Sequence, residues 1–429
     1  FPEGEDFIEY SADPPSAKTL ACFKDPQETK RSVCTVSWHP DAGRKLAVAF
    51  SIMQFQDDRS LKCGIESYIW DVNNPNTPET SLTPPSPLTC LEYNPKDPNL
   101  LAGGSYNGLV SSYDTRVGSA PKDVSVIESS HRDPVFKIQW LPGKTPFECV
   151  STSTDAQVLW WDVRKLQEPI ESLWLSDKTD NGTLLGGTAL EYSGAGGKFM
   201  VGSESGKIVA CSRKGKTPAD KIGNIWEAHC GPVYALTRNA YFPKFYVTVG
   251  DWCVKVWNDE IRTPILTSKC SKSYVTDAIW SPTRPGVFVS TKLDGTLDVW
   301  DIFSRQNDPT LSLQVDADAL RCVKIQEAGS YVATGSADGK TYMLELNEGL
   351  SNIQPGEKVA VLNMLERESK REKNLEARAK ELKAKAKRME EAQNKGEEET
   401  GEPWDVTVKT IEDSFWSQVG VDDPDATLE

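Results

Sequence analysis

The chain has 429 residues, enough to bury a large core in one domain or to form two or three smaller ones. It is 38% hydrophobic and 26% charged, and no apolar run approaches the roughly 20 residues of a membrane-spanning helix, so we predict no membrane insertion. The net charge is −15, of which residues 1–356 carry −9, and this sign argues against a general nucleic-acid binder, which needs a basic face.

The N-terminal segment, residues 1–25, contains one stretch with strand character, AKTLACFKD at Ala17–Asp25. The chain begins at Phe1 without an initiator Met or a signal segment, so we expect its natural start to lie upstream. Its ten cysteines are scattered from Cys22 to Cys322, and no two have the C-x-x-C spacing. This pattern favours free thiols in a reducing compartment over disulfides or a metal site.

A repeat occupies residues 26–356. A small or polar turn residue is followed six positions later by a residue that closes an apolar strand, and the seven pairs are Gly64/Trp70, Asn107/Tyr113, Asp155/Trp161, Ser205/Cys211, Asp251/Trp257, Asp294/Trp300 and Asp338/Leu344. The strand ends lie 43 to 50 residues apart, a period somewhat above ~40–45. Each period holds at least three strands, and a fourth is expected before the next repeat.

Four-stranded repeats of this length with Trp-Asp endings resemble the WD-repeat family, whose sheets stand as the blades of a propeller. The predicted fold is therefore all-β, a seven-bladed WD-repeat β-propeller, followed by a charged helix and an acidic tail. A propeller must join its first and last blades. Since the last repeat is followed by a helical pattern, we predict that Ala17–Asp25 supplies the outer strand of blade seven.

The resemblance assigns several polar residues to the blades themselves. It implies a buried hydrogen-bonded set within blade three and another within blade five, and it makes the Asp and Trp of blade six part of that blade's construction. These residues are His131, Asp155 and Trp161; His229, Thr248, Asp251 and Trp257; and Asp294 and Trp300. Blades four and seven depart from the pattern at Ser205, Cys211 and Leu344, so we expect them to be more deformable.

The residues give little support for catalysis. The Gly-Lys-Thr of Arg213–Pro218 lacks the glycine that a phosphate loop needs, because Ala210 stands there, and no acidic cluster has a calcium-binding frame. We therefore expect no catalytic residue, metal or cofactor. Partner recognition is the better role, and the candidates beside the predicted sets are Trp252, Tyr106 and Arg132. The alternative for Trp252 is that it folds back over its own blade.

Two segments follow the repeats. Glu357–Lys395 has 12 basic against 8 acidic residues and no Gly or Pro, and it predicts a basic helix whose apolar stripe (Leu362, Leu365, Leu375, Leu382, Met389) is too narrow to be core. It could be a solvated helix, a coiled-coil strand or a surface for an acidic partner. Gly396–Glu429 has 11 acidic residues against one basic residue. Its apolar stretch Pro403–Gly420 predicts a docking motif, with Trp404, Phe415 and Trp416 contacting the ring or a partner.

A narrower resemblance covers nearly the whole chain. Stretches such as KRSVCTVSWHPDAGRKLAVAFSIMQFQ and RNAYFPKFYVTVGDWCVKVWNDEIRTPI resemble the intermediate chains of dynein, and LNMLERESKREKNLEARAKEL points to those of the axonemal outer arm. The resemblance implies a non-catalytic scaffold that binds a dynein heavy-chain tail beside a second intermediate chain. Dynein light chains would bind upstream of Phe1. The implied location is the cytoplasm and the axoneme of a cilium or flagellum.

Two alternatives stay open from the sequence. One is an intermediate chain of cytoplasmic or ciliary-transport dynein, which belongs to the same class of machine. The other is a WD-repeat adaptor of another assembly, such as a ubiquitin ligase, which would use the same ring to hold substrates.

Overall fold

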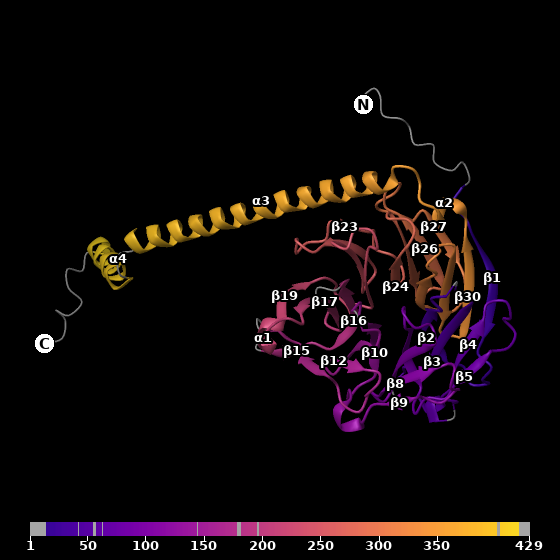
Figure 1. The fold of residues 1–429 in the computed structure, drawn as a ribbon. Helices are drawn as coiled ribbons and strands as arrows, with labels where there is room; N and C mark the ends of the chain where they lie inside the picture. Colours follow the sequence, from indigo (N-terminus) through magenta and orange to yellow (C-terminus); the bar gives the residue numbers. More distant parts are fainter. Residues whose placement is uncertain are drawn as a thin grey trace. The chain divides into compact units, whose positions relative to one another are not determined.

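The computed structural model describes residues 14–41, 43–54, 57–61, 63–143, 145–177, 182–194, 197–400 and 404–419. The chain divides into two compact units, Phe1–Ser369 and Lys370–Glu429, which are described separately. The first unit contains seven four-stranded antiparallel sheets arranged as a ring (Figure 1), which confirms the predicted seven-bladed propeller. Within the described residues, no helix is long and apolar enough to cross a membrane.

The strands of each blade run from the central channel outward. Blade one has β2 (Ser32–Trp38), β3 (Lys45–Ser51), β4 (Ser67–Asp71) and β5 (Thr80–Leu82), and blade two has β6 (Leu88–Tyr93), β7 (Leu100–Ser105), β8 (Val110–Asp114) and β9 (Asp123–Val124). Blade three has β10 (Val135–Trp140), β11 (Glu148–Ser153), β12 (Gln157–Asp162) and β13 (Glu171–Trp174), and blade four has β16 (Gly187–Ser193), β17 (Lys198–Ser203), β18 (Lys207–Ser212) and β19 (Ile222–Glu227).

The remaining blades follow the same order. Blade five has β20 (Ala235–Arg238), β21 (Phe245–Val249), β22 (Val254–Asn258) and β23 (Leu266–Thr267), and blade six has β24 (Val275–Trp280), β25 (Val287–Lys292), β26 (Thr296–Asp301) and β27 (Leu311–Gln314). Blade seven has β28 (Leu320–Ile325), β29 (Tyr331–Ser336), β30 (Lys340–Leu346) and β1 (Ala17–Lys24). Short elements between blades are η2 (Ile127–Ser129) and the pair β14 (Ser176–Asp177) and β15 (Thr183–Leu184), while η1 (Asp58–Leu61) lies within blade one and α1 (Pro218–Lys221) within blade four.

The ring is closed by the strand that the sequence singled out. β1 pairs antiparallel with β30, from Ala17 opposite Leu346 to Lys24 opposite Lys340 (Figure 1). Immediately after β1, Asp25 accepts two hydrogen bonds from the buried guanidinium of Arg31, at 2.7 and 2.8 Å. This ion pair ties the closing strand to the start of blade one.

Side chains also fasten several inner strands to their neighbours. Hydroxyl groups near the starts of the inner strands donate to backbone carbonyls of the next blade, and these bonds are Thr35 to Thr89 (3.0 Å), Thr89 to Val135 (2.6 Å), Thr188 to Val233 (2.7 Å) and Thr276 to Leu320 (2.7 Å). The inner strands β2 and β28 are also in contact, so the contacts continue across the closure. A ring joined in this way presents its loops on a rigid frame.

The turns between the second and third strands are also fixed by their neighbours. In blade six, Gly295 has φ +81°, and a Cβ there would collide with the carbonyl oxygen of Asp316. Only glycine meets both conditions without strain. The turn of blade six therefore packs closely under the loop that leads into blade seven.

The start of the long helix corrects an expectation. α3 runs from Glu357 to Thr400, five residues past the predicted end, and follows the short α2 (Glu348–Ser351). Its side chains Val361, Met364 and Leu365 are buried in the core cluster of blades five and six, so the stripe is core at this end. Their i, i+3, i+4 spacing makes a wider apolar face than the seven-residue spacing of the later leucines.

The second unit contains the rest of α3 and α4 (Trp404–Val419). The predicted docking motif is thus helical over those residues, while Pro403, Gly420 and the side chain of Trp404 lie outside the described part. Phe415 and Trp416 are exposed, and their ring centroids are 5.4 Å apart. Leu375 and Leu382 are exposed as well, as expected for a narrow stripe.

Candidate functional site

Blade three contains a buried chain of polar side chains. Trp161 Nε1 donates to Ser151 Oγ at 2.8 Å, and Ser151 Oγ lies 2.7 Å from His131 Nε2. Because an ionised carboxylate can only accept, His131 Nδ1–H donates to Asp155 at 3.1 Å, and the Nε2 of a neutral imidazole then accepts from the serine hydroxyl. Burial opposes ionisation of Asp155, but the His131 contact outweighs it and lowers the pKa of the carboxyl group.

Blade five repeats the arrangement with threonine in place of serine. Trp257 Nε1 donates to Thr248 Oγ1 at 2.8 Å, and this oxygen lies 2.8 Å from His229 Nε2. His229 Nδ1 lies 3.0 Å from Asp251 Oδ1. Burial alone would raise the pKa of Asp251, but the histidine and the backbone N–H groups of Cys230 and Cys253 lower it to about 2. Both histidines are enclosed, so these sets are structural.

Blade six has only part of this set. Trp300 is 5% exposed, as predicted, and donates to Ser290 Oγ at 2.9 Å. Asp294 does not join it, because the blade has no histidine; it is exposed and accepts from the backbone N–H of Thr296 at 3.0 Å. In blade four, Ser205 Oγ contacts Ser203 Oγ at 2.9 Å and Cys211 is buried at the tryptophan position.

These contacts define one end of the ring. The histidines lie in the loops that lead into the inner strands, here called leading loops, and the aspartates lie in the turns between second and third strands. We call the end formed by the leading loops and these turns the mouth face. A cavity of about 380 Å³ opens there into the central channel.

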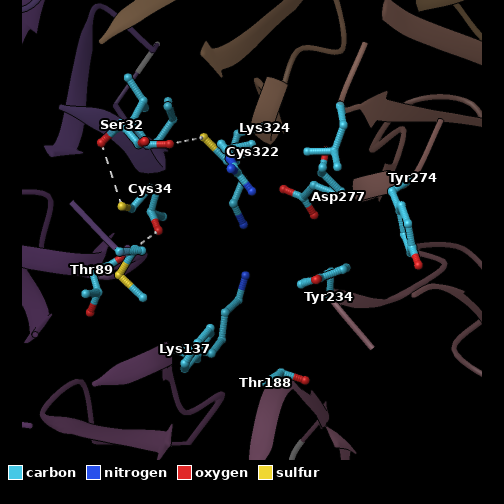
Figure 2. Close-up of a pocket in the computed structure, with 18 of the residues that line it drawn as sticks. Ser32, Cys34, Thr89, Lys137, Thr188, Tyr234, Tyr274, Asp277, Cys322 and Lys324 are labelled. Atoms are coloured by element: carbon cyan, nitrogen blue, oxygen red, sulfur yellow. Dashed lines mark hydrogen bonds between the residues drawn. The ribbon is translucent and has the colours of Figure 1, made fainter. Parts of the chain in front are cut away.

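The cavity has an apolar collar around a charged interior (Figure 2). The collar consists of Met53, Phe136, Tyr234, Tyr274 and Leu293, and the charged groups are Lys137, Asp277, Arg321 and Lys324. Figure 2 labels Tyr234, Tyr274, Lys137, Asp277 and Lys324 among them. Tyr234 is 45% exposed, and Met53, Tyr274 and Leu293 are also accessible. Exposed aromatic and methionine side chains are typical of the centre of a protein interface.

The charged groups described inside the cavity act on one another without close ion pairs. Asp277 Oδ2 accepts from the backbone N–H of Val323 at 2.9 Å, and the charges of Lys137 and Lys324 act on the buried carboxyl groups of Glu92, Glu191 and Asp277. Figure 2 shows both lysine side chains pointing into the cavity. The charge on Lys137 and then burial lower the pKa of Lys324, while burial raises that of Asp277. The interior therefore holds ammonium and carboxyl groups together, and its exposed positive charge is Arg321 at the edge.

Three of the predicted recognition residues, Trp252, Tyr106 and Arg132, lie at the mouth face but do not form one cluster. Trp252 is 41% exposed, and its ring lies 4.5 Å from that of Tyr274, so it leans toward the leading loop of blade six. Tyr106 is half-buried and Arg132 is exposed in the turn and leading loop of blades two and three. Neither lines the cavity.

The sequence reasoning missed the collar. Phe136 and Tyr234 each stand five residues after a blade histidine, in HRDPVF and HCGPVY. That shared offset is the signal that could have found them, because it places Phe136 at the second position of the inner strand β10 and Tyr234 directly before the inner strand β20. Within the described residues, no three His, Cys, Asp or Glu side chains are placed to hold a metal ion.

The seven blades and the His–Ser/Thr–Trp sets define a WD40 β-propeller. The family model described as "Dynein axonemal intermediate chain 3 WD40 domain" matches residues 17–120 and 189–346. The chain belongs to the family of axonemal dynein intermediate chains, which places it in the axoneme of a cilium or flagellum.

Three relatives show the extent of the similarity. The chain is 52% identical over 376 residues to "Dynein intermediate chain 3, ciliary" of Heliocidaris crassispina, covering 86% of this chain and 63% of the relative. It is 48% identical to "Dynein axonemal intermediate chain 2" of Homo sapiens, covering 95% and 67%. It is 45% identical to "Dynein, 70 kDa intermediate chain, flagellar outer arm" of Chlamydomonas reinhardtii, covering 86% and 66%. The chain thus spans about two thirds of the length of these relatives.

Proposed function

We propose that the chain is a non-catalytic scaffold subunit of an axonemal outer-arm dynein, and that the mouth face of its propeller binds a dynein heavy-chain tail. The observation that carries the proposal is the apolar collar on a closed ring. Met53, Tyr234, Tyr274 and Leu293 come from blades one, five and six, yet they surround one opening. A rigid opening of this kind can bind a partner segment without losing the conformational entropy that ordering a flexible loop would cost.

The charges of the site indicate the chemistry of the bound segment. Arg321 is exposed at the edge of the opening, and Lys137 and Lys324 lie inside it, where their charges act on buried carboxyl groups. The heavy-chain segment would place an acidic side chain toward Arg321 and apolar side chains on the collar. Trp252, whose ring is packed at a tilt against that of Tyr274, would widen the apolar contact.

The proposal includes further partners. A second intermediate chain would pair with this one to assemble the arm, and dynein light chains would be further members of the same assembly. The name of the Chlamydomonas reinhardtii relative, which includes the words "flagellar outer arm", supports the outer-arm assignment.

The C-terminal helix α4 would supply a second docking element. Its exposed Phe415 and Trp416 are costly to leave in water, which supports a partner contact for them. Deletion of residues 403–420 is expected to weaken the binding of at least one dynein subunit to the isolated chain. If the binding of no subunit changed, α4 would not be a docking element.

Crosslinking mass spectrometry on isolated axonemes tests the main proposal. Lys272 is exposed in the leading loop of blade six, two residues from Tyr274, and it should crosslink to a heavy-chain tail. Lys18, exposed on the outer strand of blade seven, provides the comparison and should give fewer such crosslinks. Heavy-chain crosslinks from Lys18 without any from Lys272 would contradict binding at the mouth face.

A further inference from the structure

Two cysteines of blade five lie close together beside Trp252. Cys253 Sγ and Cys270 Sγ are 3.2 Å apart, although the residues are 17 positions apart in the chain. Cys253 is buried just before β22, and Cys270 is exposed just after β23. Each of the ten cysteines is a free thiol, and only these two are described with a sulfur-to-sulfur contact.

The backbone holds the two sulfurs together. Ser268 N donates to Val254 O at 2.9 Å, and Ser271 N donates to Trp252 O at 2.7 Å, one on either side of the cysteine pair. These bonds continue the pairing of β22 with β23, in which Lys255 stands opposite Thr267. A disulfide bond is about 2.05 Å long, so the sulfurs need to approach by only about 1 Å.

The site is open to small molecules. Cys270 and Trp252 both border a surface cavity of about 130 Å³ between blades five and six. Burial, followed by the contact with Cys270, raises the pKa of Cys253 to about 12, so Cys253 stays protonated. The exposed thiol of Cys270 is therefore the one that a small oxidant meets first.

From this geometry we infer that Cys253 and Cys270 form a reversible redox site, which a low-molecular-weight disulfide such as glutathione disulfide oxidises to an intrachain disulfide. The Cys270 thiolate attacks one glutathione sulfur, forms a mixed disulfide and releases one glutathione thiolate. Cys253 then gives its proton to water, attacks Cys270 Sγ and expels the second glutathione. Two protein thiols are oxidised, and one glutathione disulfide is reduced to two thiols.

The bond would fix the backbone on both sides of Trp252. Trp252 directly precedes Cys253, and its carbonyl oxygen already accepts from Ser271, which directly follows Cys270. Oxidation would therefore hold Trp252 in its position against Tyr274, and reduction would release that constraint. The site does not depend on which partner the mouth face binds, so it can be tested on the isolated chain.

The test uses the full chain, first reduced and then equilibrated in glutathione buffers of increasing oxidising strength, alkylated and digested with trypsin. Cleavage after lysine places Cys253 in residues 245–255 and Cys270 in residues 270–272. We expect these peptides to become linked, with the loss of two hydrogen atoms. Reduction should separate them, and Cys270→Ser should abolish the link.

Cys230 is the matched control, since it is exposed in the leading loop of blade five and has no described thiol contact. It should stop at the glutathione mixed disulfide, as should Cys270 in a Cys253→Ser variant. The proposal would be overturned if Cys270 of the unaltered chain also stopped there, if Cys253 stayed open to alkylation after unfolding, or if the linked peptides came from two different chains.

Discussion

Arg284, in the loop after β24, forms a buried ion pair with Glu357, the first residue of α3, at a distance of 2.9 Å. The same guanidinium lies 3.2 Å from Asp301 and donates to the carbonyl oxygen of Gly349 at 2.6 Å. The helix is thus joined to blade six by a polar contact as well as by its buried apolar residues.

Replacing Arg284 should therefore destabilise the propeller. In Arg284→Met two carboxylates stay buried without their cation, and breaking a buried pair in this way costs about 3–5 kcal/mol. Arg367→Ala is the control, because Arg367 is exposed on the same helix and should cost less than about 1 kcal/mol. Urea denaturation measures both values, and equal effects would show that the Arg284 pair does not anchor the helix.

Trp300→Ala should cost about 3–5 kcal/mol of unfolding free energy, because it opens a cavity in the core and leaves Ser290 without its donor. The affinity for a partner should fall only to the extent that the loss of Trp300 disturbs the packing of blade six. Calorimetry compares this variant with Trp174→Ala, which removes an exposed tryptophan of β13. The comparison separates the effect of removing a buried side chain from the effect of removing any tryptophan. A loss of binding with unchanged thermal stability would instead make Trp300 a contact residue.

Removing residues 1–25 should lower the thermal stability, since it leaves β30 without its outer partner and Arg31 without the Asp25 carboxylate. Lys18→Ala, which changes an exposed side chain of β1 and keeps the strand, should have little effect. Thermal unfolding followed by circular dichroism makes the comparison. An unchanged midpoint in the truncated chain would mean that β1 does not close the ring.

Glu191 should make stability depend on pH. Burial raises its pKa to about 7 in the folded ring, above the ordinary 4.5, against the opposing charges of Arg238, Lys137 and Lys324. The folded state therefore binds the Glu191 proton more tightly than the unfolded state does. This contribution to the free energy of unfolding is fully present below about pH 4.5 and is lost as the pH rises through 7. The loss is about 2–3 kcal/mol, which is less than the full pKa shift implies, because the side chain keeps some accessible surface.

Glu191→Gln, which is neutral throughout, should remove this loss. Urea denaturation at about pH 5 and pH 8 measures it, and Glu204→Gln, an exposed change in the same blade, should keep the dependence of the unaltered chain. The same slope in Glu191→Gln as in the unaltered chain would assign the pH dependence to other groups.

Features that depend on residues close together in the chain could be predicted from the sequence. The blades could be predicted because a turn residue and a tryptophan recur six residues apart, as at Asp251 and Trp257. This pattern lies within one blade, so it does not depend on how the blades are arranged in the ring. The closing strand could be predicted because a propeller leaves one strand unpaired. The family resemblance also specified the histidine sets before any geometry was known.

The remaining features depend on contacts between distant residues. Arg284 and Glu357 are 73 positions apart, and neither has a local pattern that indicates burial. The collar contains both Met53 and Tyr274, which line one cavity only because the ring closes. The six-residue spacing groups Asp294 with Trp300. Blade six has no histidine to pair with the aspartate, so the spacing alone does not predict the contacts of Asp294.

The most direct test of the central claim is reassembly of the chain with a heavy-chain tail fragment. The double variant Trp252→Ala/Tyr274→Ala is compared with Trp174→Ala, whose tryptophan is 45% exposed on blade three, away from the cavity. If the mouth face binds the tail, the double variant should bind at least about 30-fold more weakly, as for the loss of a 2 kcal/mol anchor, while the control binds normally. Normal binding by the double variant, or equal loss in both variants, would contradict the account.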